Sequence, residues 1–513
     1  MKNIFLYIII AFCSLSCISV KKYNAKLDQP IPPEKLKSDV DFAYRKLQQL
    51  HPNLYWYIDK ENLEHQFDSL KTTITIPLKP AEFYQKLAPI ISNIHEGHLR
   101  LVPPEKRMTK KELKNLENQK GLLGRMNYVI DQNRIFVKDN ADKFENIKVG
   151  TEILKIKDVP VQNYLNDYQK LVNSDGDNTT FQKYMLAKRW PIFFTIDHGI
   201  LDSVKIETKY QNEIKDFYIH REKISKEEKK EEKKQIATIK KDNAQKNKDY
   251  NPAIRAYNRD LQFLAKDSSI AYMKIKTFSG TKSAKFYKES FKKIEENKSK
   301  YLILDIRDNL GGSLSEINNL YSYLALDDFK FINDIEVTSR NSMFHANYFN
   351  EFSNVAKPFA GIVYPIYIIG TAFSSKKIDG KVYLRNNNIF SIKKPKKTAF
   401  KGKIYVLING SSFSAASILP SKLKGDKRAI LVGEETGGAN DGTVAGRYST
   451  EKLPNSKIYL PIGLMLIQPN IEFSNTKKGV TPDIEIVPKL SDILAKKDLE
   501  LDHVIKEIRR ENH

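Results

Sequence analysis

Cysteine is almost absent from this sequence. The 513 residues include only Cys13 and Cys17, both close to the N-terminus. The rest of the chain therefore has no disulfide and no cysteine that could act as a nucleophile. With 41% hydrophobic and 11% aromatic residues, the composition is that of a globular protein, and the length suits two to four domains.

Nucleotide-binding and nucleic-acid-binding motifs are also missing. The sequence has no G-x-G-x-x-G or Walker lysine motif, and no helix-turn-helix, zinc-knuckle or RNA-binding aromatic motif. The net charge of +23, from 85 Lys and Arg against 62 Asp and Glu, is therefore interpreted as a generally lysine-rich composition. Nucleic acid is excluded as the main partner.

The N-terminus has the layout of a secretory signal. Lys2 precedes an apolar run at residues 4–13, which is too short to span a bilayer. Cys17 follows small residues and resembles the lipidated cysteine of a bacterial lipoprotein. We expect a signal peptide at 1–16, a polar tether at 17–36, and a lipid-anchored protein of the cell envelope, periplasmic or attached to the outer membrane. Secretion without a lipid is the alternative.

The spacing of apolar residues and the local composition change several times along the chain. Apolar residues at helical spacing predict a helical region at 37–120, and short β-rich runs follow at 121–220. A charged, low-complexity stretch at 221–265 indicates a linker. Buried-strand runs alternate with amphipathic helices over 266–490, which predicts an α/β domain, and the chain closes with an amphipathic helix at 491–513.

The β-rich region contains a stretch that resembles a PDZ-like module. Residues 150–161 read "GTEILKIKDVPV", similar to the G-x-x-I-L-x-I-x-x-x-P-V pattern of such modules. PDZ-like modules accept an extended peptide as an added strand, so this region is a candidate peptide-docking site. Any small β-barrel produces a similar pattern, and that alternative stays open.

Two loops of the α/β domain could supply catalytic groups. In "DIRDNLGGS" at 305–313 a strand turns into a helix through glycines, whose backbone N–H groups can stabilise an oxyanion. In "NGSSFSAASILP" at 409–420, Ser414 is predicted at the N-terminus of a helix, where negative charge is favoured. Serines in this place are also common helix caps, so Ser412 and Ser414 have a purely structural alternative.

Four motifs in order resemble the tail-specific, or C-terminal processing, serine peptidases. They are "YLILDIRDNLGG", "LINGSSFSAAS", "AILVGEETGG" and "GVTPDIEI", within residues 268–488. The resemblance implies an α/β fold with a crotonase/ClpP-like β-β-α core, Ser414 as the nucleophile, and an oxyanion hole from the N–H groups of Gly311 or Gly312 and of Ala415. It also implies a polypeptide substrate and neither a metal nor an organic cofactor.

The lysine base of the processing branch is absent. The position that it takes in that branch is Ala439 here, and no lysine lies between Lys427 and Lys452. A serine at its free pKa is a poor nucleophile without a base.

A histidine is the candidate replacement for this base. "SNIHEGHLRL" resembles the DGHT element of the tricorn-like and retinoid-binding-like branch, in which the histidine is the base, and the matching residue is His98, with Glu96 and Leu99 in place of Asp and Thr. His95 is the competing candidate. Zinc is not indicated, because the H-E-x-x-H spacing is missing.

The acid that orients the histidine is harder to assign. In the tricorn-like branch a glutamate precedes the "GV-x-PD" motif, and the nearby acid here is Glu472; another common position for it is Thr476. Glu434 or Glu435 could substitute. A further stretch, "NSDGDNTTFQKY" at 173–184, resembles one found in envelope members of the family. We interpret it as a marker of the family and assign it no role in the mechanism.

The sequence therefore predicts a serine peptidase that hydrolyses polypeptides through an acyl-enzyme. The alternative is a binding protein that keeps the same scaffold without turnover, as in the retinoid-binding branch, and the missing lysine is the reason to consider it.

Overall fold

The computed structural model describes residues 19–139, 147–231, 233–234, 237, 249–251, 256–264, 268–347, 357–385, 390–472 and 477–511. The predicted signal peptide and Cys17, part of the predicted charged linker, and Thr476 lie outside the described residues. Within the described ranges, no helix combines the length and the apolar character needed to cross a membrane.

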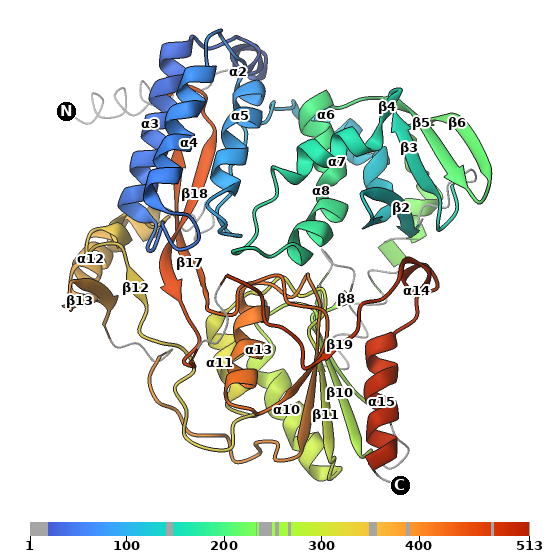
Figure 1. The fold of residues 1–513 in the computed structure, drawn as a ribbon, viewed down its shortest axis with the longest axis vertical. Coiled ribbons are helices and arrows are strands. Elements are labelled where there is room, and N and C mark those ends of the chain that lie inside the picture. The colour runs from blue at the N-terminus through green and yellow to red at the C-terminus, as the bar shows by residue number, and fades with distance from the viewer. Residues whose placement is uncertain are drawn as a thin grey trace, which may run out of the picture.

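A mostly parallel sheet forms the lower half of the molecule (Figure 1). Its strand order is β19-β16-β15-β11-β10-β9, with β9 as the antiparallel edge. All five residues of β11 are buried, which explains its unbroken apolar sequence. The strands are β9 (Arg259–Phe263), β10 (Ile270–Ile275), β11 (Tyr301–Asp305), β15 (Lys403–Ile408), β16 (Ile430–Gly433) and β19 (Ile484–Glu485).

Helices cover both faces of this sheet. Residues of α10, α11 and α13 share one core with one face of the strands, and Val504 and Ile508 of α15 pack on the other face. The bounds are α10 (Ser283–Glu296), α11 (Leu314–Tyr321), α13 (Ala415–Gly425), α14 (Leu490–Leu494) and α15 (Leu499–Glu511).

A second, antiparallel sheet connects this half to the N-terminal helices. Its order is β13-β14-β12-β18-β17, and the long β17–β18 hairpin runs up beside α3, α4 and α5 (Figure 1). The strands are β12 (Glu336–Val337), β13 (Ser375–Ile378), β14 (Lys381–Leu384), β17 (Thr443–Lys452) and β18 (Tyr459–Ile467), with η2 (Ser342–His345) and α12 (Lys357–Ala372) beside them. The N-terminal helices are α2 (Val20–Leu27), α3 (Pro33–Leu50), α4 (Lys60–Thr73), α5 (Pro80–Ser92) and α6 (Lys110–Glu117).

The third sheet belongs to a separate β module with its own core. The order β1-β2-β3-β5-β6, with β4 paired to β3, wraps a core that contains Trp190 and Ile153. Phe413, from the loop before α13, is part of this core, so the module packs directly on that loop. Its elements are η1 (Leu123–Arg125), β1 (Asn127–Asp131), β2 (Arg134–Asp139), β3 (Glu152–Ile156), β4 (Val159–Pro160), α7 (Val161–Gln169), α8 (Thr180–His198), β5 (Ser203–Tyr210) and β6 (Glu213–His220); a small pair, β7 (Tyr250–Asn251) and β8 (Ala256–Tyr257), follows.

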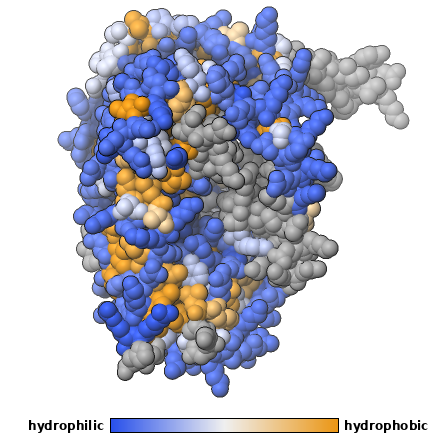
Figure 2. Space-filling view, turned by 90° about the vertical axis from the view of Figure 1, so that its right-hand side faces the viewer, coloured by the Kyte–Doolittle hydropathy of each residue, from blue (hydrophilic) through white to orange (hydrophobic). Residues whose placement is uncertain are grey.

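The chain is thus a mixed α/β protein with several sheets. The face on the side of β5, β6 and α15 is largely hydrophilic, with hydrophobic residues gathered in a band along part of it (Figure 2). This distribution fits a sequence in which 29% of the residues are charged.

Candidate active site

Ser414 stands at the start of α13 in a strained backbone conformation. Its φ of 58° and ψ of −122° lie in a region that non-glycine residues rarely occupy. Its side chain is partly exposed, whereas Phe413 and Ala415 on either side are buried, and it makes no capping hydrogen bond to the helix. The hydroxyl is therefore not used as a helix cap.

The preceding serines hold the loop in this shape. The Ser412 hydroxyl donates to the Ile306 carbonyl at 2.9 Å and accepts the Asn409 N–H at 3.1 Å. The Asn409 side-chain oxygen accepts the N–H groups of Asp308 (3.0 Å) and Ser411 (3.1 Å). These bonds join the loop before Ser414 to the loop that follows β11.

The glycine turn after β11 lies directly against Ser414. A Cβ on Gly311 would be 2.8 Å from the Cβ of Ser414 and 2.9 Å from the Ala415 nitrogen, so only glycine allows this approach. Gly312 has a φ of 144°, and a Cβ added to it would lie 2.2 Å from the Phe278 carbonyl oxygen. This position therefore also has no room for a side chain.

The three predicted oxyanion donors differ in their hydrogen bonds. The N–H of Gly311 donates to the side-chain oxygen of Asn309 at 2.8 Å. The N–H groups of Gly312 and Ala415 have no acceptor among the described residues. The latter two are therefore the donors free to meet a substrate oxygen in this structure.

His98 lies beside the loop that carries Ser414. Its ring stacks on Phe413, the residue before Ser414, with ring centroids 4.6 Å apart. Its Nδ1 is 2.9 Å from the Thr443 hydroxyl and 3.5 Å from Oε1 of Glu96. With Nδ1 turned toward Glu96 and Thr443, Nε2 is the ring nitrogen that these two residues leave free.

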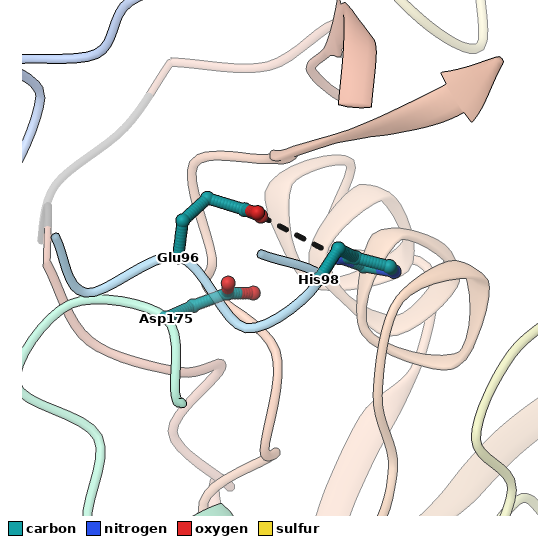
Figure 3. Close-up of side chains that lie close together, drawn as sticks. All are labelled: Glu96, His98 and Asp175. Carbon is teal, nitrogen blue, oxygen red and sulfur yellow. Dashed lines mark ion pairs between the residues drawn. The ribbon is translucent and has the colours of Figure 1, made fainter. Parts of the chain in front are cut away.

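Two buried carboxylates accompany this histidine (Figure 3). Glu96 is 2% exposed, and its Oε1 accepts the Thr443 hydroxyl and the Val444 N–H, each at 3.3 Å. Asp175 comes from the loop before α8 and accepts the Gly97 N–H at 2.6 Å. Figure 3 shows the Glu96 carboxylate directed at the imidazole, with Asp175 beneath both.

The charges of this cluster shift its pKa values. Burial alone lowers the pKa of His98, but the Glu96 carboxylate outweighs it and the pKa of His98 is raised above its ordinary value of 6.5. Burial raises the pKa of Glu96, yet the pairing with His98 brings it below its ordinary value. Burial, and then the nearby Glu96 charge, raise the pKa of Asp175 to about 7.

The remaining acids named from the sequence lie elsewhere. Glu472 is exposed and follows Ile471, which packs on Gly425 at the end of α13 opposite Ser414. Glu434 accepts the Tyr184 hydroxyl, and Glu435 accepts the Asn178 side chain at 3.0 Å. The structure therefore does not bring Glu472, Glu434 or Glu435 to His98.

Ala439, at the position of the lysine in the processing branch, has a backbone role. Its N–H donates to Asp175 at 3.2 Å. The ring of His95 turns to the carbonyl of Gly176 at 2.8 Å instead of joining the cluster.

Sequence reasoning did not assign roles to Glu96, Thr443 or Asp175. Glu96 stood out only as a departure from the family pattern, and Asp175 lay within the "NSDGDNTTFQKY" stretch. That stretch was the available signal for Asp175, whereas nothing around Thr443 in the sequence indicated a role.

The chain is similar to known peptidases in sequence and in fold. Residues 269–486 match the model of peptidase family S41. No curated protein matches the sequence. The solved structure of mature CPAF complexed with lactacystin aligns over 93% of this chain and 97% of its own, with 16% identity and a TM-score of 0.60. A structure of mature CPAF aligns over 90% and 94%, with 16% identity and a TM-score of 0.56.

At this identity the structural likeness establishes the fold, and the family match identifies the α/β part of the chain. The predicted relationship to the tail-specific, C-terminal processing peptidases is confirmed, and a binding protein without turnover is not favoured. Residues 269–486 form a peptidase S41 domain, and the chain is a serine peptidase.

Proposed function

We propose that Ser414 is the nucleophile of this peptidase and that His98 is its general base, as in the tricorn-like branch of the family. The observation that carries the proposal is the stacking of the His98 ring on Phe413, next to the strained Ser414. A residue held in such a backbone conformation is often found where a side chain must be presented for reaction.

In this mechanism the Ser414 oxygen attacks the scissile carbonyl while His98 Nε2 takes the hydroxyl proton. The N–H groups of Gly312 and Ala415 hold the oxyanion, a contribution of about 3–4 kcal/mol for each donor. His98 then gives the proton to the leaving amine, and water hydrolyses the acyl-enzyme with the same histidine as base.

Glu96 replaces Glu472 in our assignment of the orienting acid. The Thr443 hydroxyl is within hydrogen-bond distance of both His98 Nδ1 and Glu96 Oε1, so it can relay the orientation from carboxylate to ring. This arrangement keeps the proton on Nδ1 and leaves Nε2 free to act as a base.

A fluorophosphonate probe tests the choice of histidine. We expect His98→Ala to lower the rate of labelling about 10²–10⁴-fold, because general-base activation of the serine is lost. His95→Ala is the matched control, since it removes the neighbouring histidine of the same loop, and labelling should stay within about twofold of wild type. Equal loss in both variants contradicts the assignment of His98.

We further propose that the S41 domain has a crotonase-like core and that the β module is PDZ-like and receives the substrate as an added strand. In the described part of the chain β6 pairs only with β5, and it exposes Ile214 (60%) and Tyr218 (59%). An open strand edge with alternate apolar side chains suits an extended polypeptide.

Substitution on β6 separates docking from chemistry. Ile214→Arg combined with Tyr218→Arg is expected to raise KM for an unfolded polypeptide about fivefold or more, because about 1 kcal/mol of contact is lost. Fluorophosphonate labelling should stay unchanged, since the small probe needs no docking strand. An unaltered KM would show that β6 does not hold the substrate.

For the location of the enzyme we propose the cell envelope, with lipidation at Cys17. The support is the apolar run at residues 4–13 followed by small residues and this cysteine. We expect the full-length protein to enter the detergent phase in a detergent phase-separation assay and Cys17→Ser to stay in the aqueous phase. Partitioning that does not change in Cys17→Ser contradicts lipidation at this residue.

A further inference from the structure

The catalytic histidine belongs to a cluster that could hold a metal ion. One donor atom from each of Glu96, His98 and Asp175 lies within 4.8 Å of the other two. Glu96 and Asp175 are 2% and 1% exposed, and the His98 side chain is 13% exposed. Two carboxylates and one imidazole buried together leave an excess of negative charge, which a cation would compensate.

Unpartnered polar atoms next to the cluster point to a ligand as well. Oε2 of Glu96 is buried and has no hydrogen-bond partner among the described residues. The same is true of both ring nitrogens of His51, which is 3% exposed and interacts electrostatically with Glu96. A buried carboxylate oxygen and a buried imidazole without partners are costly unless something binds them.

The chemistry of the three donor groups, one imidazole and two carboxylates, favours some metal ions over others. Imidazole nitrogen with carboxylate oxygen suits Zn²⁺, which commonly takes three protein ligands and keeps an open position. Ca²⁺ and Mg²⁺ prefer sites made of oxygen alone, so the imidazole disfavours them.

We propose that Glu96, His98 and Asp175 bind a zinc ion that reversibly inhibits the peptidase. The ion is an inhibitor in this proposal and takes no part in the reaction. His98 presents Nδ1 to Glu96, so zinc binds the Nδ1 lone pair of the neutral ring. The neutral ring has a single N–H proton, which zinc binding shifts from Nδ1 to Nε2 through solvent, and Nε2 then cannot accept the proton of Ser414. This inhibitory consequence rests on the proposed role of His98, whereas zinc binding itself does not.

Calorimetry with zinc chloride on the Ser414→Ala protein tests the binding without any need for activity. We expect one zinc per chain, with Kd raised at least about tenfold when Asp175→Asn or Glu96→Gln is added. His65→Ala is the control for adventitious binding to an exposed histidine and should leave Kd unchanged. Equal zinc affinity with and without the cluster substitutions overturns the site, as does calcium binding of equal strength. Thermal melting of each variant verifies folding. Because Asp175→Asn and Glu96→Gln are tested separately, one of them still tests the site if the other does not fold.

Inhibition is then measured on the wild-type enzyme. Zinc chloride is expected to block fluorophosphonate labelling over the concentration range in which it binds, and a chelator should restore the labelling. Zinc that binds through the cluster but leaves labelling unchanged overturns the inhibitory role. A wild-type protein that neither labels nor hydrolyses peptides contradicts the proposed function instead, and the calorimetric result still decides the metal site.

Discussion

Ser414→Ala is expected to lower kcat/KM for peptide hydrolysis about 10⁴-fold or more, with the fold retained. The hydroxyl makes no hydrogen bond to the described residues, so its removal costs no structural contact, whereas acyl-enzyme formation is lost entirely. Steady-state hydrolysis of an unfolded polypeptide, followed by fluorophosphonate labelling, measures the effect.

Ser411→Ala provides the matched control for this variant. Ser411 lies in the same loop, but its contribution there is the backbone N–H donated to Asn409. Activity within a few-fold of wild type is therefore expected. Substantial turnover or labelling in Ser414→Ala would show that another residue is the nucleophile.

Glu96→Gln is expected to lower kcat/KM about 10²–10⁴-fold and to change its pH dependence. The Glu96 charge raises the pKa of His98, and the histidine must be neutral to act as a base. Activity therefore falls as the pH drops through the raised pKa of His98. Without the charge that pKa is lower, so the acid limb of the pH profile should move to lower pH.

The pH profiles should be recorded with a chelator present, because a bound metal would also respond to pH. Glu472→Ala is the comparison, since this exposed residue lies toward the other end of α13, and both its rate and its acid limb should match wild type. If the acid limb of the kcat/KM profile shifts in Glu472→Ala but not in Glu96→Gln, Glu472 rather than Glu96 orients the histidine.

The S41 relationship was accessible from the sequence because its motifs are local. The glycines after β11, the small residues around Ser414 and the "GVTPD" stretch each form one loop whose chemistry depends on neighbours in the chain. Buried parallel strands such as β11 can also be recognised in the sequence as continuous apolar runs.

The surroundings of His98 could not be predicted in this way. Glu96, Asp175 and Thr443 come from the loop after α5, the loop before α8 and the first residue of β17, and only tertiary packing brings them together. Glu472 shows the limit of an argument from spacing. Its distance in sequence from "GVTPD" does not reveal that the neighbouring Ile471 packs on Gly425, at the end of α13 away from Ser414.

Secondary structure was misjudged where tertiary context overrides the local pattern. The region 121–220 is rich in strand-forming runs, yet it includes the 19-residue helix α8 with Pro191 inside it. The long β17–β18 hairpin was likewise not anticipated within the α/β domain, although it supplies Thr443 to the site.

The position at which the processing branch has its lysine plays a structural role in this chain. At Ala439 the backbone N–H binds Asp175, so this position helps to hold a carboxylate near His98 instead of supplying a base. In the proposed mechanism the proton acceptor is His98, on a loop of the N-terminal helical region.

The central claim, that Ser414 and His98 work as one catalytic unit, is tested most directly by a double-mutant cycle on kcat/KM. Each alanine variant and the Ser414→Ala/His98→Ala double variant are assayed with the same unfolded polypeptide. Residues that act as a unit give grossly non-additive losses, so the double variant should be no less active than Ser414→Ala within about twofold. Losses that multiply in the double variant would contradict the pairing of these two residues.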